Sequence, residues 1–498
     1  MACLAGAAGL AAIAAASVGT GAAMASAGSA RPHVIHAAGR GHAKSARIIN
    51  FRQRAKIWQS SHKKQATRPP LRTGQKASPM AAFTTAFDGI SQAGCGDCLA
   101  NPVVATSANG AQIVEATQTL VQVFDKNGTS LCNGELALNA FLNTPSATDP
   151  QLQYDNVADQ FILTAIPAGE PSPPTLYVAV TTDHDACGNW RVLTVNLSGG
   201  PFTATSSLDL QFMGQDTRAL LFSVINIDRN ADEFDTWNVF TLSKDALYGD
   251  GPLNFATFPV EFDTVPVTTA GSPTIDSADS YFLSANFEEG YGLYTMTGSG
   301  TPTPTLTSRQ QVGDPYLPPD GTPALEILFS SPVFDGSRIW FTQVVGTDPD
   351  PRDEGTAAVR YGYLNLADDS MTLAHISSAP HSWNLAPSIN VSPNRDGTVS
   401  VFVNWMVMGN TEPTPVSDRV RSIIYPGSGP LPDSVATDQE VAVSQSGGDV
   451  LAPDTVSGTA IDPGTANGSC AVTAQQYVSH DGSWVTRVRR KCGPTPLS

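Results

Sequence analysis

The sequence lacks several features that would each point to a class of protein. After residue 90 it shows no long amphipathic helical pattern, which argues against a helical bundle. It contains no GxSxG, HExxH, phosphate-loop or dinucleotide-binding fingerprint, so none of these catalytic or nucleotide sites is indicated. Beyond the N-terminal region no apolar run is long enough to span a bilayer.

Positive charge is scarce over most of the chain. Twelve of the 28 Lys and Arg lie within residues 28–76, where there is no Asp or Glu. Residues 77–498 contain the other 16 together with all 45 acidic residues. An acidic body repels phosphate, so nucleic acid is not expected as a partner. The acidity leaves two interpretations open, which are solubility alone and the binding of cations.

The N-terminal 27 residues have the composition of an export signal. They are apolar and rich in Ala, and they end in Ala25-Ser26-Ala27, which matches an A-x-A cleavage site. No Lys or Arg precedes the apolar run, and the alternative is a membrane anchor, although mostly Ala and Gly hold a helix poorly in lipid. We therefore expect a signal peptide over 1–27 and a secreted protein, extracellular or periplasmic, with no membrane span in its mature form.

Residues 28–94 form a basic leader. Their composition predicts a disordered leader or a propeptide, and the alternative is a tether to an acidic surface, including the protein's own body. The apolar residues Ile48, Ile49, Phe51 and Trp58 could form a short amphipathic helix, but we find no capping signal for one.

Six cysteines follow the signal region. An even number in an exported chain predicts three disulfides, for which 15 pairings are possible. The six residues are Cys95, Cys98, Cys132, Cys187, Cys470 and Cys492. Cys470 and Cys492 flank a predicted hairpin, which their pairing would staple. The CxxC spacing of Cys95 and Cys98 also occurs in redox enzymes, but no βαβ context surrounds it, so a structural disulfide is favoured.

A Pro-marked turn followed by two short strands recurs along the chain. Five copies start at Asn101, Asp149, Ser272, Ser331 and Ala386, each directly before a Pro. A sixth starts at Leu208 without the Pro, and the Cys470–Cys492 hairpin is a less regular seventh. Four-stranded units repeated at about 50 to 60 residues are typical of propeller blades. We predict an all-β fold, with a single disulfide-stabilised β-propeller over 95–498. We expect seven four-stranded blades, with six as the runner-up, and both chain ends meeting in one blade.

Three segments carry a resemblance to a known family. They are DPQLQYDNVADQFILTA from Asp149, LYVAVTTDHDACGNWRVLTV from Leu176 and QFMGQDTRALLFSVINI from Gln211. These segments resemble a family of secreted bacterial β-propeller proteins, whose blades open with a DPxxxYDxxxxRW-like pattern. The chain departs from that pattern at Gln160 and at Asp185-Ala186. The resemblance implies the fold and export, and the family has no established activity to imply a mechanism.

One acidic loop is a candidate metal site. It begins D-x-N-x-D, like the start of a calcium loop, with the candidate ligands Asp228, Asn230, Asp232 and Asp235. Glu233 stands where an EF-hand needs Gly, so this is not an EF-hand. The loop could still hold calcium, the one cofactor we consider, and the alternative is a solvated loop between strands.

Propellers place binding sites at one mouth of the central channel, on loops from several blades. Polar residues near the blade openings are therefore candidates, namely Asp149, Asp155, Asp216, Asp276 and His381. A glycosidase needs two carboxylates about 5–10 Å apart, as Asp149 and Asp155 could supply. A polysaccharide lyase needs a base and a cation, as His381 with Arg360 or Arg338 could supply.

Two functions from different classes follow from these residues. The first is a secreted, monomeric β-propeller that binds an extracellular glycan or protein through its channel mouth or loop rim. The alternative is a carbohydrate-active enzyme, a glycoside hydrolase or a polysaccharide lyase, on the same scaffold. The missing catalytic signature favours binding, although propeller enzymes spread their residues over several blades, so whether the protein is an enzyme is left open.

Overall fold

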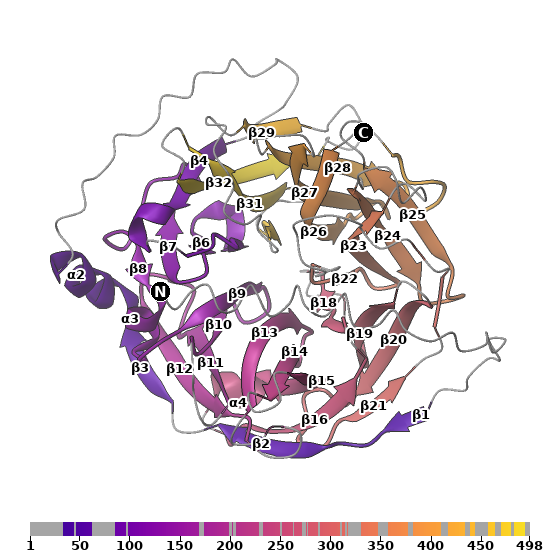
Figure 1. Cartoon of the computed structure of the whole chain (residues 1–498), viewed down its shortest axis with the longest axis horizontal. Coiled ribbons are helices and arrows are strands. Elements are labelled where there is room, and N and C mark those ends of the chain that lie inside the picture. Colours follow the sequence, from indigo (N-terminus) through magenta and orange to yellow (C-terminus); the bar gives the residue numbers. More distant parts are fainter. Residues whose placement is uncertain are drawn as a thin grey trace.

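Short strands joined by tight turns make up most of the protein, as the Pro- and Gly-rich repeat predicts. The computed structural model describes residues 33–43, 46–61, 85–95, 98–168, 174–198, 202, 206–228, 233–249, 251–261, 263–270, 275, 277–286, 289–308, 311–313, 316, 330–346, 357–376, 382–409, 417–433, 439–443, 457–463, 470–479 and 483–493. The sheets stand around a common axis as the blades of a β-propeller (Figure 1), which confirms the predicted fold class.

The described strands form antiparallel meanders that follow one another around the ring. The first meander consists of β5 (Val103–Thr106), β6 (Ile113–Ala116), β7 (Leu120–Phe124) and β8 (Leu136–Ala137). The second consists of β9 (Thr148–Asp155), β10 (Gln160–Ile166), β11 (Thr175–Thr181) and β12 (Asn189–Asn196). The third consists of β13 (Ser206–Gln215), β14 (Ala219–Asp228), β15 (Glu233–Ser243) and β16 (Asn254–Val260). Two short helices lie at strand ends, α3 (Leu138–Leu142) and α4 (Lys244–Tyr248).

The remaining meanders follow around the ring, and β18 pairs parallel with β22 while the other pairs within a meander are antiparallel. They are β17 (Val265–Pro266), β19 (Asp279–Asn286), β20 (Gly290–Thr297) and β21 (Thr305–Ser308); β18 (Thr268–Thr269), β22 (Val333–Phe334), β23 (Arg338–Gly346), β24 (Ala357–Asn365) and β25 (Met371–Ile376); β26 (Ser382–Pro393), β27 (Val399–Gly409), β28 (Ser417–Tyr425) and β29 (Gln439–Val443); and β30 (Gly458–Ile461), β31 (Cys470–Val478), β32 (Trp484–Cys492) and β4 (Thr85–Ser91). The two-residue strands β17 and β18 follow each other closely yet pair with different sheets. The expected count of seven blades stays a prediction.

Aspartates close the first hairpin of several blades. The Oδ1 atom of Asp155 accepts hydrogen bonds from the backbone N–H groups of Val157 and Ala158, at 2.9 and 3.1 Å. Asp216 and Asp335 accept in the same way from the residues two and three positions further on. This is the geometry of an Asx-turn, and it explains why the repeat carries Asp at that point.

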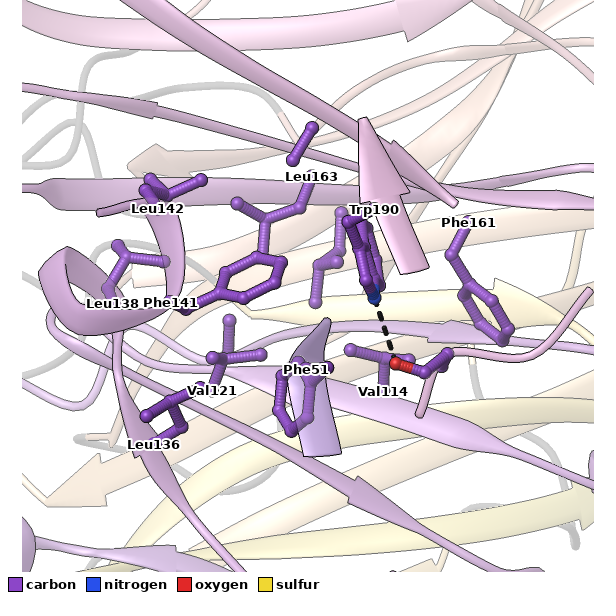
Figure 2. Close-up of a cluster of buried hydrophobic side chains, with 14 of the residues drawn as sticks. Phe51, Val114, Val121, Leu136, Leu138, Phe141, Leu142, Phe161, Leu163 and Trp190 are labelled. Carbon is purple, nitrogen blue, oxygen red and sulfur yellow. Dashed lines mark hydrogen bonds between the residues drawn. The ribbon is translucent and has the colours of Figure 1, made fainter. Parts of the chain in front are cut away.

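The hydrophobic core lies between the blades. One cluster joins the first meander to the second and includes Phe141, Phe161 and Trp190, which are fully buried (Figure 2). The Trp190 indole N–H donates to the Ala186 carbonyl at 2.8 Å, so its polar atom is satisfied inside the cluster. Further clusters of the same kind join the second meander to the third, the fifth to the sixth and the last to the first. A blade therefore depends on its neighbours to cover its two faces.

The ring closes through strands from opposite ends of the chain. Strand β4 pairs antiparallel with β32 and is the outer strand of the last meander. The two ends were expected to meet in one blade, and they do. Because β4 lies on the N-terminal side of Cys95, the ring also includes residues that the sequence analysis assigned to the leader.

Three disulfides join the six cysteines outside the signal region. The pairs are Cys95–Cys98, Cys132–Cys187 and Cys470–Cys492. The last pair staples the terminal hairpin as expected, whereas Cys132–Cys187 joins the first meander to the second. Within the described residues no helix is both long enough and apolar enough to cross a membrane.

The described residues between 33 and 61, here called the strap, run along the outside of the ring (Figure 1). The strand β1 (His33–Ile35) pairs with β21, and β2 (Gly39–Ala43) lies between β12 and β16, paired with both. The strand β3 (Arg47–Asn50) also pairs with β12, and the helix α2 (Phe51–Ser61) packs against α3 and β8. The strap thus adds backbone hydrogen bonds to the outer edges of three meanders.

A disordered leader was the expectation for this segment, and it is wrong for the strap. Phe51 and Ala55 are fully buried, and the Phe51 ring lies 5.2 Å from that of Phe141. The helix also has the cap that the sequence analysis missed, because the Asn50 side chain accepts from the Gln53 N–H at 3.0 Å. Apolar contacts and open strand edges on the ring are what order these residues.

The strap contact is open to a stability test. Replacing Phe51 with Ala removes a ring from a closed core and should lower the free energy of unfolding by about 3–5 kcal/mol. The control is Ile57→Ala on the same helix, where a side chain 64% exposed should cost no more than about 0.5 kcal/mol. Urea unfolding of both variants measures the difference, and equal midpoints would show that the strap does not contribute to the ring.

A buried acid lies at the seam where the ring closes. Glu115 on β6 is fully buried, its Oε2 accepts from the Ile90 N–H at 3.0 Å, and burial raises its pKa to about 7. An unfolded Glu ionises near 4.5, so from that pH up to about 7 the unfolded state loses its proton first and stability falls.

The expected loss is on the order of 3 kcal/mol as the pH rises from 4.5 to 7. Glu115→Gln keeps an acceptor for Ile90 and cannot ionise, so this fall should be absent from the variant. Urea midpoints measured at several pH values for both proteins test this. A gap between them that does not change with pH would contradict the assignment.

Candidate functional site

A cavity lies where the innermost strands meet at the axis of the ring. Its volume is about 130 Å³, and residues of β5, β9, β13, β18, β22, β26 and β30 line it. Strands from every described meander except the one that begins with β17 contribute to its wall. The cavity is therefore built by the ring as a whole.

The lining of the cavity is polar but uncharged. Amide and hydroxyl side chains alternate with apolar ones, and none of the described lining residues is an Asp, Glu, Lys, Arg or His. The polar members are Gln151, Gln153, Asn156, Gln215, Thr268, Thr269, Ser330, Ser331, Ser388, Asn390, Ser457 and Thr459. Tyr154 and Phe212 add aromatic surface. Such a wall suits a neutral ligand with hydroxyl groups.

Many of these polar groups hold the blades together. The Gln153 amide donates to the Met213 carbonyl at 2.8 Å and to the Thr268 hydroxyl at 2.9 Å. The Gln215 amide donates to the Tyr154 carbonyl at 2.9 Å in the opposite direction across the same seam. Buried backbone carbonyls at the axis are thereby satisfied by neutral donors from the next blade.

A smaller hollow adjoins the cavity and contains the charged groups. It shares Tyr154, Asn156, Gln215 and Thr269 with the cavity and adds Asp155, Asp216 and Lys244. Two carboxylates from adjacent blades therefore line a hollow beside the cavity. Their hydrogen bonds decide whether they are available for chemistry.

Asp155 is fully engaged in structure. Its Oδ2 atom accepts from the Lys244 ammonium at 2.8 Å and from the Tyr248 hydroxyl at 2.6 Å, while Oδ1 caps the turn. Burial alone would raise the pKa of Asp155, but the Lys244 charge and these hydrogen bonds lower it below its usual value. The carboxyl is thus ionised, enclosed and unsuited to act as a general acid.

Asp216 is occupied in the same way. Its Oδ2 atom accepts from the hydroxyls of Ser280 and Ser299, the latter at 2.9 Å, and its Oδ1 atom caps the turn. Both serines belong to the neighbouring meander, so the carboxylate joins two blades. Within the described residues, this end of the channel offers structural carboxylates and not a free acid and base pair.

The other catalytic candidates lie away from the cavity or outside the described residues. Asp149 is not among the lining residues, and its carbonyl accepts from the Gln211 amide at 2.8 Å. His381 and Asp276 lie outside the described residues. The role expected for His381 therefore stays a prediction. Asp149 and Asp155 are not brought together at the cavity wall.

Arg360 meets a different histidine from the one expected. Its Nε donates to His375 Nε2 at 3.2 Å and a terminal N–H donates to the Tyr291 hydroxyl at 3.0 Å. Burial, and then the Arg360 charge, lower the pKa of His375, and burial raises the pKa of Tyr291. This group lies on β20, β24 and β25, outside the lining of the cavity. It does not supply a base to a ligand there.

Arg338 is held inside a cage of aromatic rings. Its guanidinium lies 5.7, 5.2 and 5.6 Å from the ring centres of Trp340, Tyr363 and Tyr425, and it forms an ion pair with Asp335 at 3.0 Å. These contacts are cation–π interactions and fix the side chain in the blade. The cation proposed for a lyase is therefore used for packing.

The candidate calcium loop stays untested. Asn230 and Asp232 lie outside the described residues, and Asp228 and Asp235 belong to β14 and β15. Elsewhere in the described part of the chain, no group of three or more His, Cys, Asp or Glu side chains is placed to hold a metal.

The neutral lining of the cavity was not predicted from the sequence. Gln151 and Gln153 lie inside the quoted segment DPQLQYDNVADQFILTA, yet only its aspartates were taken as site candidates. Glutamine carries no catalytic signature, so the one available signal was their spacing of two on a strand that begins a blade. That spacing places both side chains on one side of the strand.

Comparisons with known proteins give no family for this chain. No family model matches the sequence, and no curated protein matches it. Solved structures are similar at low identity. An α-L-arabinanase from Penicillium chrysogenum, in complex with arabinobiose, shares 11% identity at a TM-score of 0.38, over 70% of this chain and 94% of its own.

Two further solved structures are similar at the same level. An exo-β-1,3-galactanase from Phanerochaete chrysosporium shares 10% identity at a TM-score of 0.30, over 78% of this chain and 92% of its own. A sialidase from Streptococcus pneumoniae shares 10% identity at a TM-score of 0.34, over 64% of this chain and 66% of its own. These values are too low to carry an activity, a substrate or a catalytic residue to this protein, and the resemblance to secreted bacterial propellers stays an expectation.

The assignment of Asp155 as structural is testable. Lys244→Met leaves the buried carboxylate without its cation and should lower the free energy of unfolding by about 3–5 kcal/mol. The double variant Asp155→Asn with Lys244→Met removes both charges while Asn still caps the turn, so it should recover much of that loss. Urea midpoints of the parent and the two variants decide this. A double variant less stable than Lys244→Met would contradict a structural ion pair.

Proposed function

We propose that this protein binds a carbohydrate in the cavity on the axis of its propeller. The observation that carries the proposal is the lining, in which amides and hydroxyls stand beside the rings of Tyr154 and Phe212 and no described residue is charged. Sugars present hydroxyls that donate and accept hydrogen bonds, and they present apolar C–H faces that pack on aromatic rings. A wall with both kinds of surface matches that chemistry.

The size of the cavity limits what enters it. About 130 Å³ exceeds the roughly 10–15 Å³ needed for one water molecule, so the space is more than a solvent gap. It is smaller than the roughly 300–1,000 Å³ of pockets that enclose a drug-sized ligand. We therefore expect a single sugar unit at the end of a chain to enter, and the rest of the glycan to remain outside.

Charge and compartment fit the same proposal. The net charge of the chain is −17, so a polyanionic polysaccharide is repelled over long range and a neutral one is not. The three disulfides support export, where the partner is an extracellular glycan. The signal peptide over residues 1–27 belongs to this proposal.

Hydrolysis is the second candidate, and one observation favours it. Asp155 and Asp216 come from adjacent blades and line the same hollow beside the cavity, and a glycosidase needs two carboxylates near its substrate. Because both are fully hydrogen-bonded within the protein, binding without cleavage is the function that the described geometry supports better.

The test uses the full chain with its disulfides intact. It is titrated with a panel of neutral and acidic glycans by calorimetry, and the same mixtures are assayed for new reducing ends and for the absorbance of unsaturated uronates. We expect saturable binding of neutral glycans without any product. New reducing ends would show that the protein is a hydrolase and would overturn the proposal of binding without cleavage. The absence of both binding and product across the panel would refute the carbohydrate proposal.

A further inference from the structure

Two glutamines on one strand face the cavity but differ in their contacts. Gln151 and Gln153 both belong to β9 and both line the cavity. Residues two apart on a strand point to the same side, so the pair presents two amides to one space. Their hydrogen bonds distinguish amide groups that bind other blades from amide groups that remain open to a ligand.

The nitrogen of the Gln153 amide is committed to the protein, while its buried Oε1 atom has no hydrogen-bond partner within the described residues. Its two N–H donors go to the Met213 carbonyl and the Thr268 hydroxyl. A carbonyl accepts and cannot donate, so the nitrogen of the amide must face Met213 and the orientation of the side chain is fixed. Through its nitrogen Gln153 therefore joins the second meander to two others, which is a structural role.

The Gln151 amide is uncommitted. Its side chain is half-buried, and it forms no hydrogen bond with any residue that the structure describes, although the backbone of Gln151 pairs with Thr164. A terminal amide offers two donors and one acceptor side by side. A pair of adjacent sugar hydroxyls has the complementary arrangement, because each hydroxyl both donates and accepts.

A second uncommitted group lines the cavity from a different blade. Thr269 on β18 lines both the cavity and the adjoining hollow, and its hydroxyl makes no hydrogen bond with the described residues. The two groups come from meanders that are not neighbours in the ring. A ligand that contacts both must therefore sit within the channel and not on the rim.

We infer that Gln151 recognises adjacent hydroxyls of a neutral sugar unit and that the cavity selects against charged sugars. The inference rests on the proposed function and names its ligand class. A uronate or an amino sugar would bring a charge into a space whose described wall holds no opposite charge, and burying an unpaired charge is costly. The neutral unit loses only water hydrogen bonds, which Gln151 and Thr269 replace.

The experiment compares the two glutamines in the full chain. Calorimetry with the neutral glycan that binds the parent protein is repeated on Gln151→Ala and on Gln153→Ala, together with urea unfolding of each. We expect Gln151→Ala to weaken binding about tenfold with an unchanged unfolding midpoint, since two neutral hydrogen bonds are lost. We expect Gln153→Ala to lower the midpoint, because it removes contacts between blades.

A third arm tests selectivity with the parent protein. The uronic acid form of the same sugar unit should bind at least tenfold more weakly than the neutral form. Equal affinity of the two forms, or full affinity in Gln151→Ala, overturns this inference while the carbohydrate proposal stands. No binding of any glycan by the parent protein overturns the proposed function and this inference with it.

Discussion

The structure depends on contacts between faces of neighbouring blades. A meander of four short strands has two apolar faces and no helix layer to cover them, so each face is buried only when the next blade packs on it. The large buried rings, such as Trp190, Trp340 and Trp405, accordingly lie in seams between blades. The ring has to close for this to work, and β4 beside β32 closes it with strands from both ends of the chain.

The same constraint explains the chemistry near the axis. Innermost strands converge there and carry buried carbonyls, and neutral amides such as Gln153 and Gln215 satisfy them across a seam. The ion pair of Lys244 with Asp155 lies in the adjoining hollow and not in the wall of the cavity. A neutral lining is therefore a consequence of how the blades are joined, and in our proposal it also selects the sugar that the cavity binds.

The sequence was sufficient for the fold but not for the site. The Pro-marked turn and paired strands repeat because each blade needs them, so local pattern predicts the propeller. The strap was missed because its order comes from strand edges on distant meanders, which composition does not reveal. Asp155 was a reasonable site candidate by its position in the repeat. Its carboxylate is nevertheless bound by Lys244 and Tyr248, which lie about ninety residues further along the chain. Gln151 was overlooked because a neutral amide signals nothing until its surroundings are known.

The strand β2 bridges two adjacent meanders on the outside of the ring. It hydrogen-bonds β12 on one side and β16 on the other, so the outer edges of two adjacent meanders belong to one continuous sheet. Opening the outer edge of this seam requires breaking backbone hydrogen bonds. The inner strands of these two meanders are β9 and β13, which carry Gln151 and Gln153 and the residues they face. The strap on the outside thus ties together the two meanders whose inner strands form one wall of the cavity.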